Sequence, residues 1–408
     1  LPSPARAPAS TIVRATGPSG ADHDVRHTNS PAWTGPRYSV TTMTLSFAAP
    51  DRPHWSDQER IDEIHAAPKV GQHFGEQVSD HMAVADWTAS DGWSGDAITD
   101  YQPLAVNPAN AVLHYAQEIF EGLKAYRHAD GSVWLFRPEE NARRLNTSAK
   151  RLALPQLPEE DFLTAVRQLV ATDARWVPDP GSGEKSLYLR PVMFANDDFL
   201  GVAPAGKVRF AILGSPVGAY FSDGVRAVDI WVERHEVRAV PGGTGAAKCG
   251  GNYAASLTAQ LAAQDRGCAQ VLFLDAVEHT WIEELGGMNF MAVTNDGRLL
   301  TPELTGSILS GITRKSILRL AHDLDLVPVE RKISIDELHD AVRAGTVQEA
   351  FACGTAAVVT PIGALVDENG RFELPSPIGE VTMTIRQRLL DIQFGRVEDP
   401  YGWTQKVC

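Results

Sequence analysis

The chain has 408 residues, a length for which two domains are more common than one. Apolar residues make up 43% of it and charged residues 22%, which is typical of a soluble globular protein rather than a fibrous or disordered one. The formal net charge of -14, without a dense Lys or Arg stripe, argues against nucleic acid or an acidic membrane as a partner.

Other bulk features bear on the cellular setting. No apolar run approaches the roughly 20 residues of a membrane span. The four cysteines form neither a CxxC pair nor a metal-binding spacing, so we expect no disulfide framework and a reducing, cytoplasmic environment. Residues 1–42 are rich in Pro, Ser, Thr, Ala and Gly and contain no apolar signal-peptide core, which predicts a disordered extension. A transit peptide, suggested by Arg6 and Arg14, is the alternative.

Helical and strand-like patterns are mixed along the first half of the chain. Apolar residues at helical spacing predict a helix between Pro138 and Pro155 and a second, amphipathic helix from Phe162 to about Val170. Apolar runs predict strands at residues 186–195, 208–217 and 228–233. Strands and helices do not alternate strictly, so the fold class is α+β, or mixed α/β.

A domain junction is expected near residues 217–224, which contain two glycines and show no clear period. We therefore predict a smaller N-terminal domain over residues 43–220 and a larger C-terminal domain over residues 221–408. In the second domain the pattern predicts a helix at 252–266 closed by Gly267, and strands at 271–275, 288–294 and 347–353. Ser334 and Glu337 predict a capping box at the start of a short helix.

The most informative segment is residues 241–253 (PGGTGAAKCGGNY), where one lysine lies among small residues just before a predicted helix. A P-loop would need Gly-Lys-Ser/Thr, but Lys248 follows Ala247 and precedes Cys249. A dinucleotide-binding fingerprint would need a third glycine where Lys248 stands. In apolar surroundings a lysine loses hydration, which lowers its pKa and leaves an amine able to form a Schiff base with an aldehyde. Taken alone, the segment favours the alternative, a solvated lysine in a flexible turn.

Motifs elsewhere in the chain decide between these interpretations. In order they are YAQEIFEGLKAY at 115–126, FRP at 136–138, YLRP at 188–191, GAYF at 218–221, KCGGNY at 248–253, ELGGMN at 284–289, GITR at 311–314 and GTA at 354–356. The set resembles the branched-chain amino-acid aminotransferases, within the fold-type IV pyridoxal-phosphate enzymes that also include D-amino-acid aminotransferases and aminodeoxychorismate lyases. The resemblance runs from about Phe74 to Trp403 and implies a two-domain, D-amino-acid-aminotransferase-like architecture with the active site between the domains.

The resemblance implies a set of cofactor-binding residues. Lys248 would hold pyridoxal 5'-phosphate and, once released, would move the proton at the substrate α-carbon. Glu284 would keep the pyridine nitrogen protonated, whereas Glu283 would point to the opposite face of its strand. Tyr253 would contact the phenolate oxygen. The phosphate would be bound by Arg144, the amides of Ile312 and Thr313, and the hydroxyl of Thr355, with Arg143 as a solvated competitor of Arg144.

The same resemblance implies a pocket for two kinds of substrate. Arg190 would pair with a dicarboxylate, and the amides of Thr355 and Ala356 would bind the α-carboxylate. An apolar wall would favour branched aliphatic side chains, each buried methylene contributing about 0.8 kcal/mol. The wall residues would be Phe74, Tyr115, Phe120, Tyr188 and Tyr220.

The implied reaction is a ping-pong amino transfer between L-leucine, L-isoleucine or L-valine and 2-oxoglutarate in a homodimer whose loops reach the partner's pocket. A D-amino-acid aminotransferase or aminodeoxychorismate lyase of the same fold is the alternative. A non-catalytic pyridoxal-phosphate-binding protein is a remote one, since Lys248 and Glu284 are both present. A nucleotide-binding protein is disfavoured by the failed glycine fingerprints.

Two positions depart from the family pattern. Gly287 stands where some members carry a threonine that contributes a side-chain contact. Ala357 and Thr360 stand where some animal members carry a redox-active CxxC. We therefore predict no thiol switch at that site.

Overall fold

The computed structural model describes residues 44–49, 74–179, 181, 183–218 and 224–408. The predicted extension at 1–42 and the predicted pocket residue Tyr220 lie outside these residues. Helices and strands both occur in each half of the described chain, so the predicted mixed α/β class is confirmed.

The first sheet is antiparallel and has eight strands among the described residues: β1 (His81–Thr88), β2 (Gly92–Asp100), β3 (Glu118–Phe120), β4 (Leu123–Arg127), β5 (Val133–Phe136), β6 (Ser186–Ala195), β7 (Lys207–Val217) and β17 (Thr404–Lys406). Its order is β17-β5-β4-β6-β7-β1-β2, with β3 also paired to β6. The helices of this part are α2 (Ala111–Tyr115), α3 (Pro138–Arg151), α4 (Glu159–Thr172) and the 3-10 helix η1 (Ala174–Trp176).

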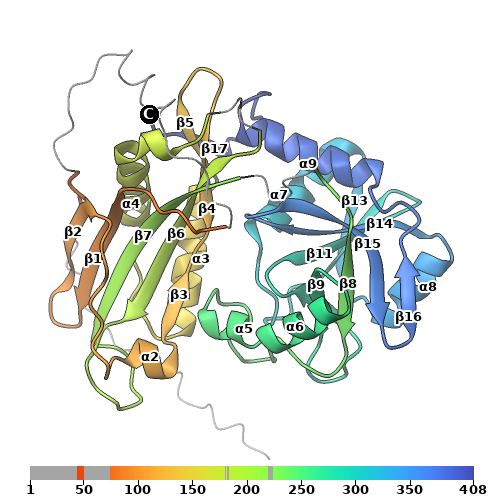
Figure 1. Cartoon of the computed structure of the whole chain (residues 1–408), viewed down its shortest axis with the longest axis horizontal. Coiled ribbons are helices and arrows are strands. Elements are labelled where there is room, and N and C mark those ends of the chain that lie inside the picture. Colours follow the sequence, from red (N-terminus) through yellow and green to blue (C-terminus); the bar gives the residue numbers. More distant parts are fainter. Residues whose placement is uncertain (1–43, 50–73, 180, 182, 219–223) are drawn as a thin grey trace, which may run out of the picture. The chain divides into compact units, whose positions relative to one another are not determined.

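Helix α4 packs on this sheet, against β1 and β7 (Figure 1). Its apolar residues recur at helical spacing, and Phe162, Val166 and Leu169 are each fully buried in the core. This burial explains why the sequence pattern located the helix, since one apolar stripe is removed from water as a unit.

The second sheet is mixed and has nine strands in the described part of the chain: β8 (Val228–Glu233), β9 (Gln270–Leu274), β10 (Ile282–Leu285), β11 (Asn289–Thr294), β12 (Arg298–Pro302), β13 (Val327–Arg331), β14 (Val347–Gly354), β15 (Val358–Asp367) and β16 (Gly370–Glu373). The pairs β8–β9, β8–β15 and β12–β13 are parallel. The helices are α5 (Gly250–Ala254), α6 (Leu257–Asp265), α7 (Ile312–Ala321), η3 (His322–Leu324), α8 (Ile335–Arg343) and α9 (Glu380–Gln393).

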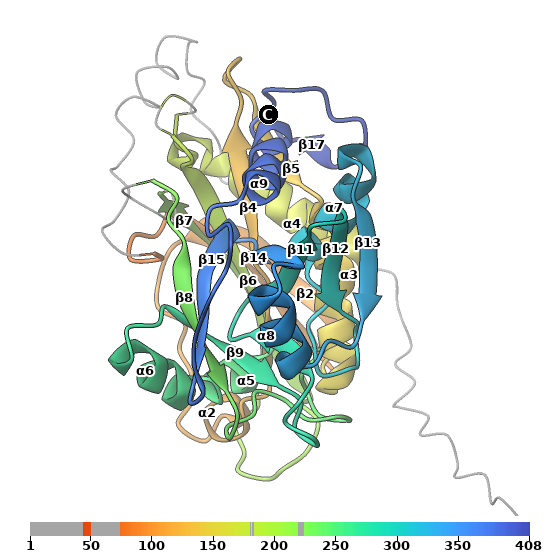
Figure 2. The ribbon, with the colours of Figure 1, turned by 90° about the vertical axis from the view of Figure 1, so that its right-hand side faces the viewer.

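The two sheets share a buried apolar cluster. It contains Tyr126 and Phe136 from the first sheet together with Met291 and Phe351 from the second. Helix α9 contacts β14 and β15 of the second sheet and β5 of the first, and Figures 1 and 2 both show it running between them. After α9 the chain returns to the first sheet, where β17 pairs with β5.

Most of the elements predicted from the sequence are present within a residue or two of the expected bounds. The strands at 186–195 and 228–233 match β6 and β8, and the two early helices match α3 and α4. Ser334 caps α8, and its hydroxyl accepts from the amide of Glu337 at 3.0 Å. A full capping box would also need the Glu337 carboxylate to accept from the amide of Ser334. That carboxylate pairs with Arg331 instead.

The prediction of one helix at 252–266 was wrong, because the structure has two, α5 and α6. The carbonyl of Tyr253 accepts from both the amide and the hydroxyl of Ser256, at 3.0 and 2.7 Å. A serine that bonds back in this way competes with the regular helical bond to the next amide. The polar side chain therefore interrupts a stretch whose residue composition is otherwise helical.

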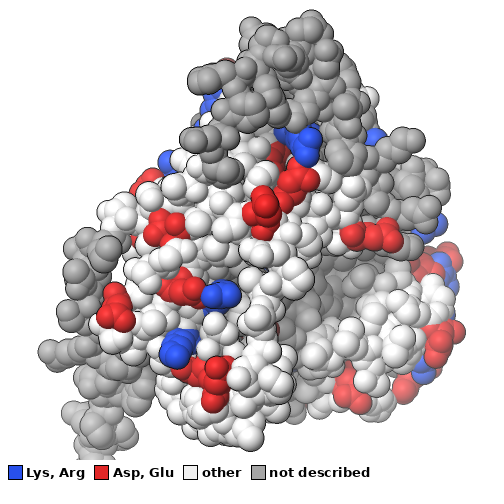
Figure 3. Space-filling view, turned by 60° about the vertical axis from the view of Figure 1, so that its left-hand side comes forward, with Lys and Arg blue, Asp and Glu red and all other residues white. Residues whose placement is uncertain are grey.

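The exposed charges are predominantly acidic on the face that Figure 3 shows. Asp and Glu side chains are spread over it and basic ones are fewer, in keeping with the net charge of -14 (Figure 3). Among the helices that the structure describes, none combines the length and apolar character needed to cross a membrane.

Candidate active site

A pocket of about 180 Å³ lies where residues of the two sheets meet. Its lining comes from β3, β6 and α3, from the loop before α5, and from turns around residues 287, 311 and 355. Most of the residues predicted from the sequence line it: Phe74, Phe120, Arg144, Tyr188, Arg190, Lys248, Tyr253, Glu284, Ile312, Thr313, Thr355 and Ala356.

Lys248 lies in this pocket, and its backbone is held on both sides. Its amide donates to the Ser148 hydroxyl and its carbonyl accepts from the amide of Phe120, both at 2.9 Å. The Nζ atom donates to the Tyr253 hydroxyl at 2.8 Å. Loss of hydration, followed by the positive charge of Arg144, lowers the pKa of Lys248 to about 7. A large fraction of the amine is therefore neutral near neutral pH, as a nucleophilic lysine requires.

Arg144 on α3 forms a buried ion pair with Glu121. Its Nε and Nη2 donate to the two carboxylate oxygens at 2.7 and 2.8 Å, and Nη1 donates to the carbonyl of Ser310 at 3.2 Å. These bonds use three of the five N–H groups of a guanidinium and leave two for a ligand. Burial alone would raise the pKa of Glu121, but Arg144 and a 2.7 Å bond from Asn141 bring it below its usual value.

Helix α7 begins next to Arg144, two residues after Ser310. The amides of Ile312 and Thr313 belong to its first turn, where backbone N–H groups have no partner inside the helix. Gly311 precedes them, and a Cβ at this position would overlap the side chain of Asn289. Arg144 and the first turn of α7 together form an environment suited to a phosphate dianion.

Glu284 on β10 forms a second buried ion pair, with Arg238 from the loop between β8 and α5. Nη2 of Arg238 lies 2.7 Å from Oε1 of Glu284, and each side chain is 4% exposed. The amide of Leu309 also donates to Oε1 at 2.7 Å, whereas Oε2 accepts a longer bond of 3.2 Å from Asn289. Burial raises the pKa of Glu284 to about 7, although Arg238 and the Leu309 amide oppose the shift.

The two competing residues point elsewhere. Glu283 is buried on the other face of β10, where the Ser307 hydroxyl donates to it. The side chain of Arg143 is 54% exposed and pairs with Glu140 at 3.1 Å. Neither residue lines the pocket, so the geometry separates each from its neighbour in the sequence.

Aromatic side chains form one wall of the pocket and surround Arg190. The rings of Phe74 and Tyr188 have centroids 4.8 Å apart, and those of Phe120 and Tyr253 are 4.9 Å apart. The guanidinium carbon of Arg190 lies 4.7 Å from the centre of the Phe120 ring, and its Nη2 donates to the Tyr188 hydroxyl at 3.1 Å. Within the described residues its Nε is buried without a hydrogen-bond partner. Arg190 therefore retains donors for a carboxylate that enters the pocket.

Tyr115 is the described residue from the predicted pocket wall that does not line this pocket. It lies on α2 with 42% of its surface exposed, and its hydroxyl donates to the carbonyl of Leu200. Leu200 and Val202, in the loop that Tyr115 contacts, are 62% and 84% exposed. The region is therefore an apolar surface rather than part of the pocket of its own chain.

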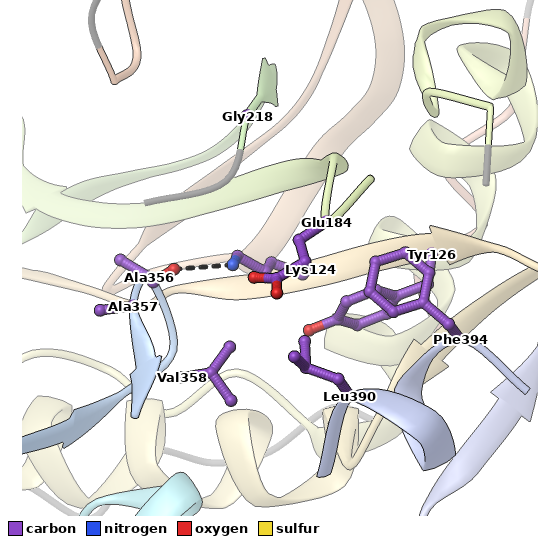
Figure 4. Close-up of a pocket in the computed structure, with 9 residues that line it drawn as sticks. All are labelled: Lys124, Tyr126, Glu184, Gly218, Ala356, Ala357, Val358, Leu390 and Phe394. Carbon is purple, nitrogen blue, oxygen red and sulfur yellow. Dashed lines mark hydrogen bonds between the residues drawn. The ribbon is translucent and has the colours of Figure 1, made fainter. Parts of the chain in front are cut away.

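The turn around residues 354–357 is fixed by a buried lysine. Lys124 on β4 donates from Nζ to the carbonyl of Ala356 at 2.8 Å, beside a small cavity that Glu184 and Tyr126 also line (Figure 4). Burial lowers the pKa of Lys124 to about 8, although the negative charge of Glu184 opposes this shift. The bond connects the first sheet to the turn that carries Thr355 and Ala356.

Comparison with known proteins identifies the family. Residues 118–365 match the family model described as amino-transferase class IV. The chain belongs to this family. The family predicted from the sequence motifs is thus confirmed, and six of those motifs contribute residues to the pocket described above.

Individual relatives and solved structures similar to this chain are branched-chain aminotransferases. The branched-chain-amino-acid aminotransferase of Mycolicibacterium smegmatis is 51% identical over 350 residues, which cover 85% of this chain and 95% of that protein. Branched-chain-amino-acid aminotransferase 2 of Bacillus subtilis is 46% identical over 336 residues, covering 82% of this chain and 92% of that protein. The solved structure of the Escherichia coli branched-chain amino acid aminotransferase has a TM-score of 0.68 at 28% identity and covers 81% of this chain and 100% of that chain. A second solved structure, the T.th. branched-chain amino acid aminotransferase with pyridoxamine 5'-phosphate, has a TM-score of 0.66 at 27% identity and covers 80% of this chain and 99% of that chain.

The residues present fit pyridoxal 5'-phosphate, on which class IV aminotransferases depend. Lys248 offers an amine of lowered pKa, and Arg144 and α7 offer donors for a phosphate. Oε2 of Glu284 keeps capacity to accept a further hydrogen bond, as a protonated ring nitrogen requires. The Tyr253 hydroxyl, next to Lys248, is a partner for the phenolate oxygen.

The residues behind the pocket wall, Glu121 and Arg238, were not predicted from the sequence. Glu121 lies in a motif, between the apolar residues Phe120 and Leu123, and a buried carboxylate in such a stretch needs a partner. That requirement was a usable signal for its pair with Arg144. Arg238 had no such signal, because it follows a run of charged residues at 233–236 that reads as solvated surface.

Proposed function

We propose that this chain is a pyridoxal-phosphate-dependent branched-chain aminotransferase that transfers the amino group between L-leucine, L-isoleucine or L-valine and 2-oxoglutarate. The observation that carries the proposal is the meeting, in one pocket, of a lysine of lowered pKa, an arginine at a helix N-terminus and a buried carboxylate. Pyridoxal phosphate, when bound, supplies a conjugated ring that accepts the electrons left on the substrate α-carbon. The remaining steps are performed by groups of the protein.

Lys248 acts as the proton carrier. With a pKa of about 7, its Nζ exists in both protonation states near neutral pH and can accept a proton in one step and donate it in the next. The hydroxyl of Tyr253, 2.8 Å from Nζ, orients the amine. Glu284 would hold a proton on the ring nitrogen of the cofactor, and Arg144 with the first turn of α7 would hold its phosphate.

The pocket wall selects the substrate side chain. Phe74, Phe120 and Tyr188 offer apolar surface to a branched aliphatic chain, whose burial contributes about 0.8 kcal/mol per methylene. Arg190 lies among them and keeps free donors for the distal carboxylate of 2-oxoglutarate. The amides of Thr355 and Ala356, in the turn held by Lys124, bind the α-carboxylate common to both substrates.

The protein acts as a cytoplasmic homodimer in this proposal. Supporting it, the exposed apolar surface formed by Tyr115, Leu200 and Val202 suits contact with a partner subunit, whose pocket wall Tyr115 would complete. The described cysteines carry free thiols, in keeping with a reducing compartment. The division of most strands between two sheets supports a smaller domain over residues 43–220 and a larger one over residues 221–408, although β17 pairs within the first sheet.

The decisive test is the absorption spectrum of the cofactor-loaded protein before and after L-leucine is added without a keto acid. We expect the yellow band to bleach to that of the pyridoxamine form, with no change on adding D-alanine. A matched Lys248→Ala protein should not show the bleaching. Bleaching by D-alanine but not L-leucine would instead support a D-amino-acid aminotransferase, and a protein that never becomes yellow would contradict the cofactor assignment.

A further inference from the structure

Arg238 connects three segments that border the pocket. Besides its 2.7 Å contact with Glu284, its Nη2 donates to the carbonyl of Ser307 and, at 3.4 Å, to that of Gly245. Ser307 precedes the loop that leads into α7, and Gly245 lies three residues before Lys248. One guanidinium therefore contacts the carboxylate on β10 and the loops that carry the proposed phosphate-binding turn and the reactive lysine.

These loops can approach closely because position 245 is a glycine. A Cβ at Gly245 would overlap the backbone of Ser307 and the side chain of Ala239. Arg238 itself is 6% exposed and does not line the pocket, so a ligand cannot reach it. Its direct contact with a residue that lines the pocket is the ion pair with Glu284.

The two oxygens of Glu284 are used unequally. Oε1 lies 2.7 Å from Nη2 of Arg238 in an ion pair and accepts a hydrogen bond from the Leu309 amide, also at 2.7 Å. Oε2 accepts the single, longer bond from Asn289 within the described residues. The arrangement orients the carboxylate so that Oε2 is the oxygen available to a donor in the pocket.

We propose that Arg238 is a positioning residue that keeps Glu284 ionised, so that the proton shared between Glu284 and the cofactor's ring nitrogen stays on the nitrogen. The inference rests on the proposed function. A buried carboxylic acid without a counter-charge retains its own proton, and a protonated Glu284 would donate to the ring nitrogen instead of accepting from it. The proton is conserved in either arrangement, and Arg238 decides on which side of the hydrogen bond it lies.

Several other charged groups face Glu284 and set the background for this effect. Lys248 in the pocket favours the carboxylate, whereas the neighbouring Glu283 favours the protonated acid. Tyr253 and Cys353 lie close enough for the negative charge of Glu284 to raise the pKa of each. Arg238 makes the direct 2.7 Å contact with Glu284. Among the groups that favour the ionised form, it lowers the pKa of Glu284 the most.

The test is nitrogen-15 NMR of holoenzyme loaded with pyridoxal 5'-phosphate labelled at the ring nitrogen, recorded at pH 7.5. We expect the wild type and Arg238→Lys to show a protonated nitrogen, and Arg238→Met an unprotonated one. The half-reaction of Arg238→Met with L-leucine should slow about 100-fold, the usual scale for losing one fixed electrostatic contact. As a control, Arg234→Met removes an arginine of the same loop that pairs with buried Asp367 at 2.8 Å and should leave the nitrogen protonated.

A double variant tests the inference if Arg238→Met alone does not fold or does not bind the cofactor. In Glu284→Gln the buried charge is gone, so adding Arg238→Met should not slow the half-reaction further. A further loss of more than about tenfold, or a protonated nitrogen in Arg238→Met, would overturn the inference while leaving the proposed function intact. A wild type that takes up no cofactor would instead contradict the proposed function and this inference together.

Discussion

Two buried ion pairs border the pocket, and they differ in which member, the acid or the arginine, faces it. In the pair Glu121–Arg144 the arginine lines the pocket and the glutamate lies behind it, whereas in Glu284–Arg238 the glutamate lines the pocket. Each pair offsets the cost of burying a charge with an opposite charge at 2.7 Å. The order of the pair sets the sign presented to a ligand, a cation for the phosphate and an anion for the ring nitrogen.

The two carboxylates also differ in pKa, although both are buried. Glu121 accepts two bonds from Arg144 and further bonds from Asn141 and the amide of Gly122, and its pKa lies below its usual value. Glu284 has one ion-pair contact with Arg238 and accepts bonds from the Leu309 amide and Asn289, and its pKa is raised to about 7 by burial. The number and geometry of donors therefore decide the ionisation of a buried acid more than burial alone. A carboxylate near its titration point is suited to share a proton.

The largest expected effect follows from breaking the first pair. Arg144→Met leaves Glu121 buried without its counter-charge, which should cost about 3–5 kcal/mol of unfolding free energy. Denaturant unfolding of the cofactor-free protein measures this loss. In Glu121→Leu/Arg144→Met the unpaired charge is gone, so most of the stability should return while cofactor affinity stays low. An equal loss of stability in the single and double variants would contradict the pairing argument.

Neutralising the acid of the second pair should affect the reaction more than the fold. Glu284→Gln keeps the shape of the side chain but cannot hold the ring nitrogen protonated, so we expect the L-leucine half-reaction to slow about 100- to 1000-fold. Single-turnover absorbance measurements give this rate. Cofactor binding should change far less than in Arg144→Met, and a larger loss of affinity in Glu284→Gln would reverse the roles of the two pairs.

The family resemblance of the sequence predicted most of the described residues that line the pocket. Lys248 and Glu284 lie in separate motifs and Arg144 lies six residues after the FRP motif, and the fold brings all three to one cavity. The helices and strands were also predictable where one face is apolar, as in α4. The break between α5 and α6 was not, because it depends on a single hydroxyl-to-carbonyl bond of Ser256 rather than on periodicity.

The residues that support the pocket from behind could not be predicted. The pairing of Arg238 with Glu284 joins positions 46 apart in the sequence, and neither periodicity nor turn chemistry encodes such a contact. The same applies to the bond from Lys124 to the turn at Ala356. Tyr115 illustrates the opposite case. The motif resemblance predicts it in the pocket wall, but within one chain it lies at the surface and does not line the pocket.

The second pair also predicts how stability depends on pH in the cofactor-free protein. The pKa of Glu284 is raised from 4.5 to about 7, so the folded state binds more protons than the unfolded state between these values. Its contribution to stability is therefore present below pH 4.5 and is lost as pH rises through about 7. Between pH 5 and 8 the wild type should lose about 1–3 kcal/mol relative to Glu284→Gln, measured by denaturant unfolding. A constant difference between the two proteins would contradict the raised pKa.

The smallest expected effect concerns Cys353, a buried pocket residue near Glu284. Burial raises the pKa of its thiol to about 12, and the negative charge of Glu284 adds to the shift while Arg314 opposes it. Because the thiolate is the reactive form, we expect no alkylation of Cys353 by iodoacetamide at pH 8, as checked by mass spectrometry of tryptic peptides. Glu284→Gln removes one cause of the shift but leaves burial, the larger one, so its labelling should rise only slightly. Rapid labelling of Cys353 in the wild type, or peroxide inactivation that a thiol reductant reverses, would contradict the raised pKa of this buried thiol.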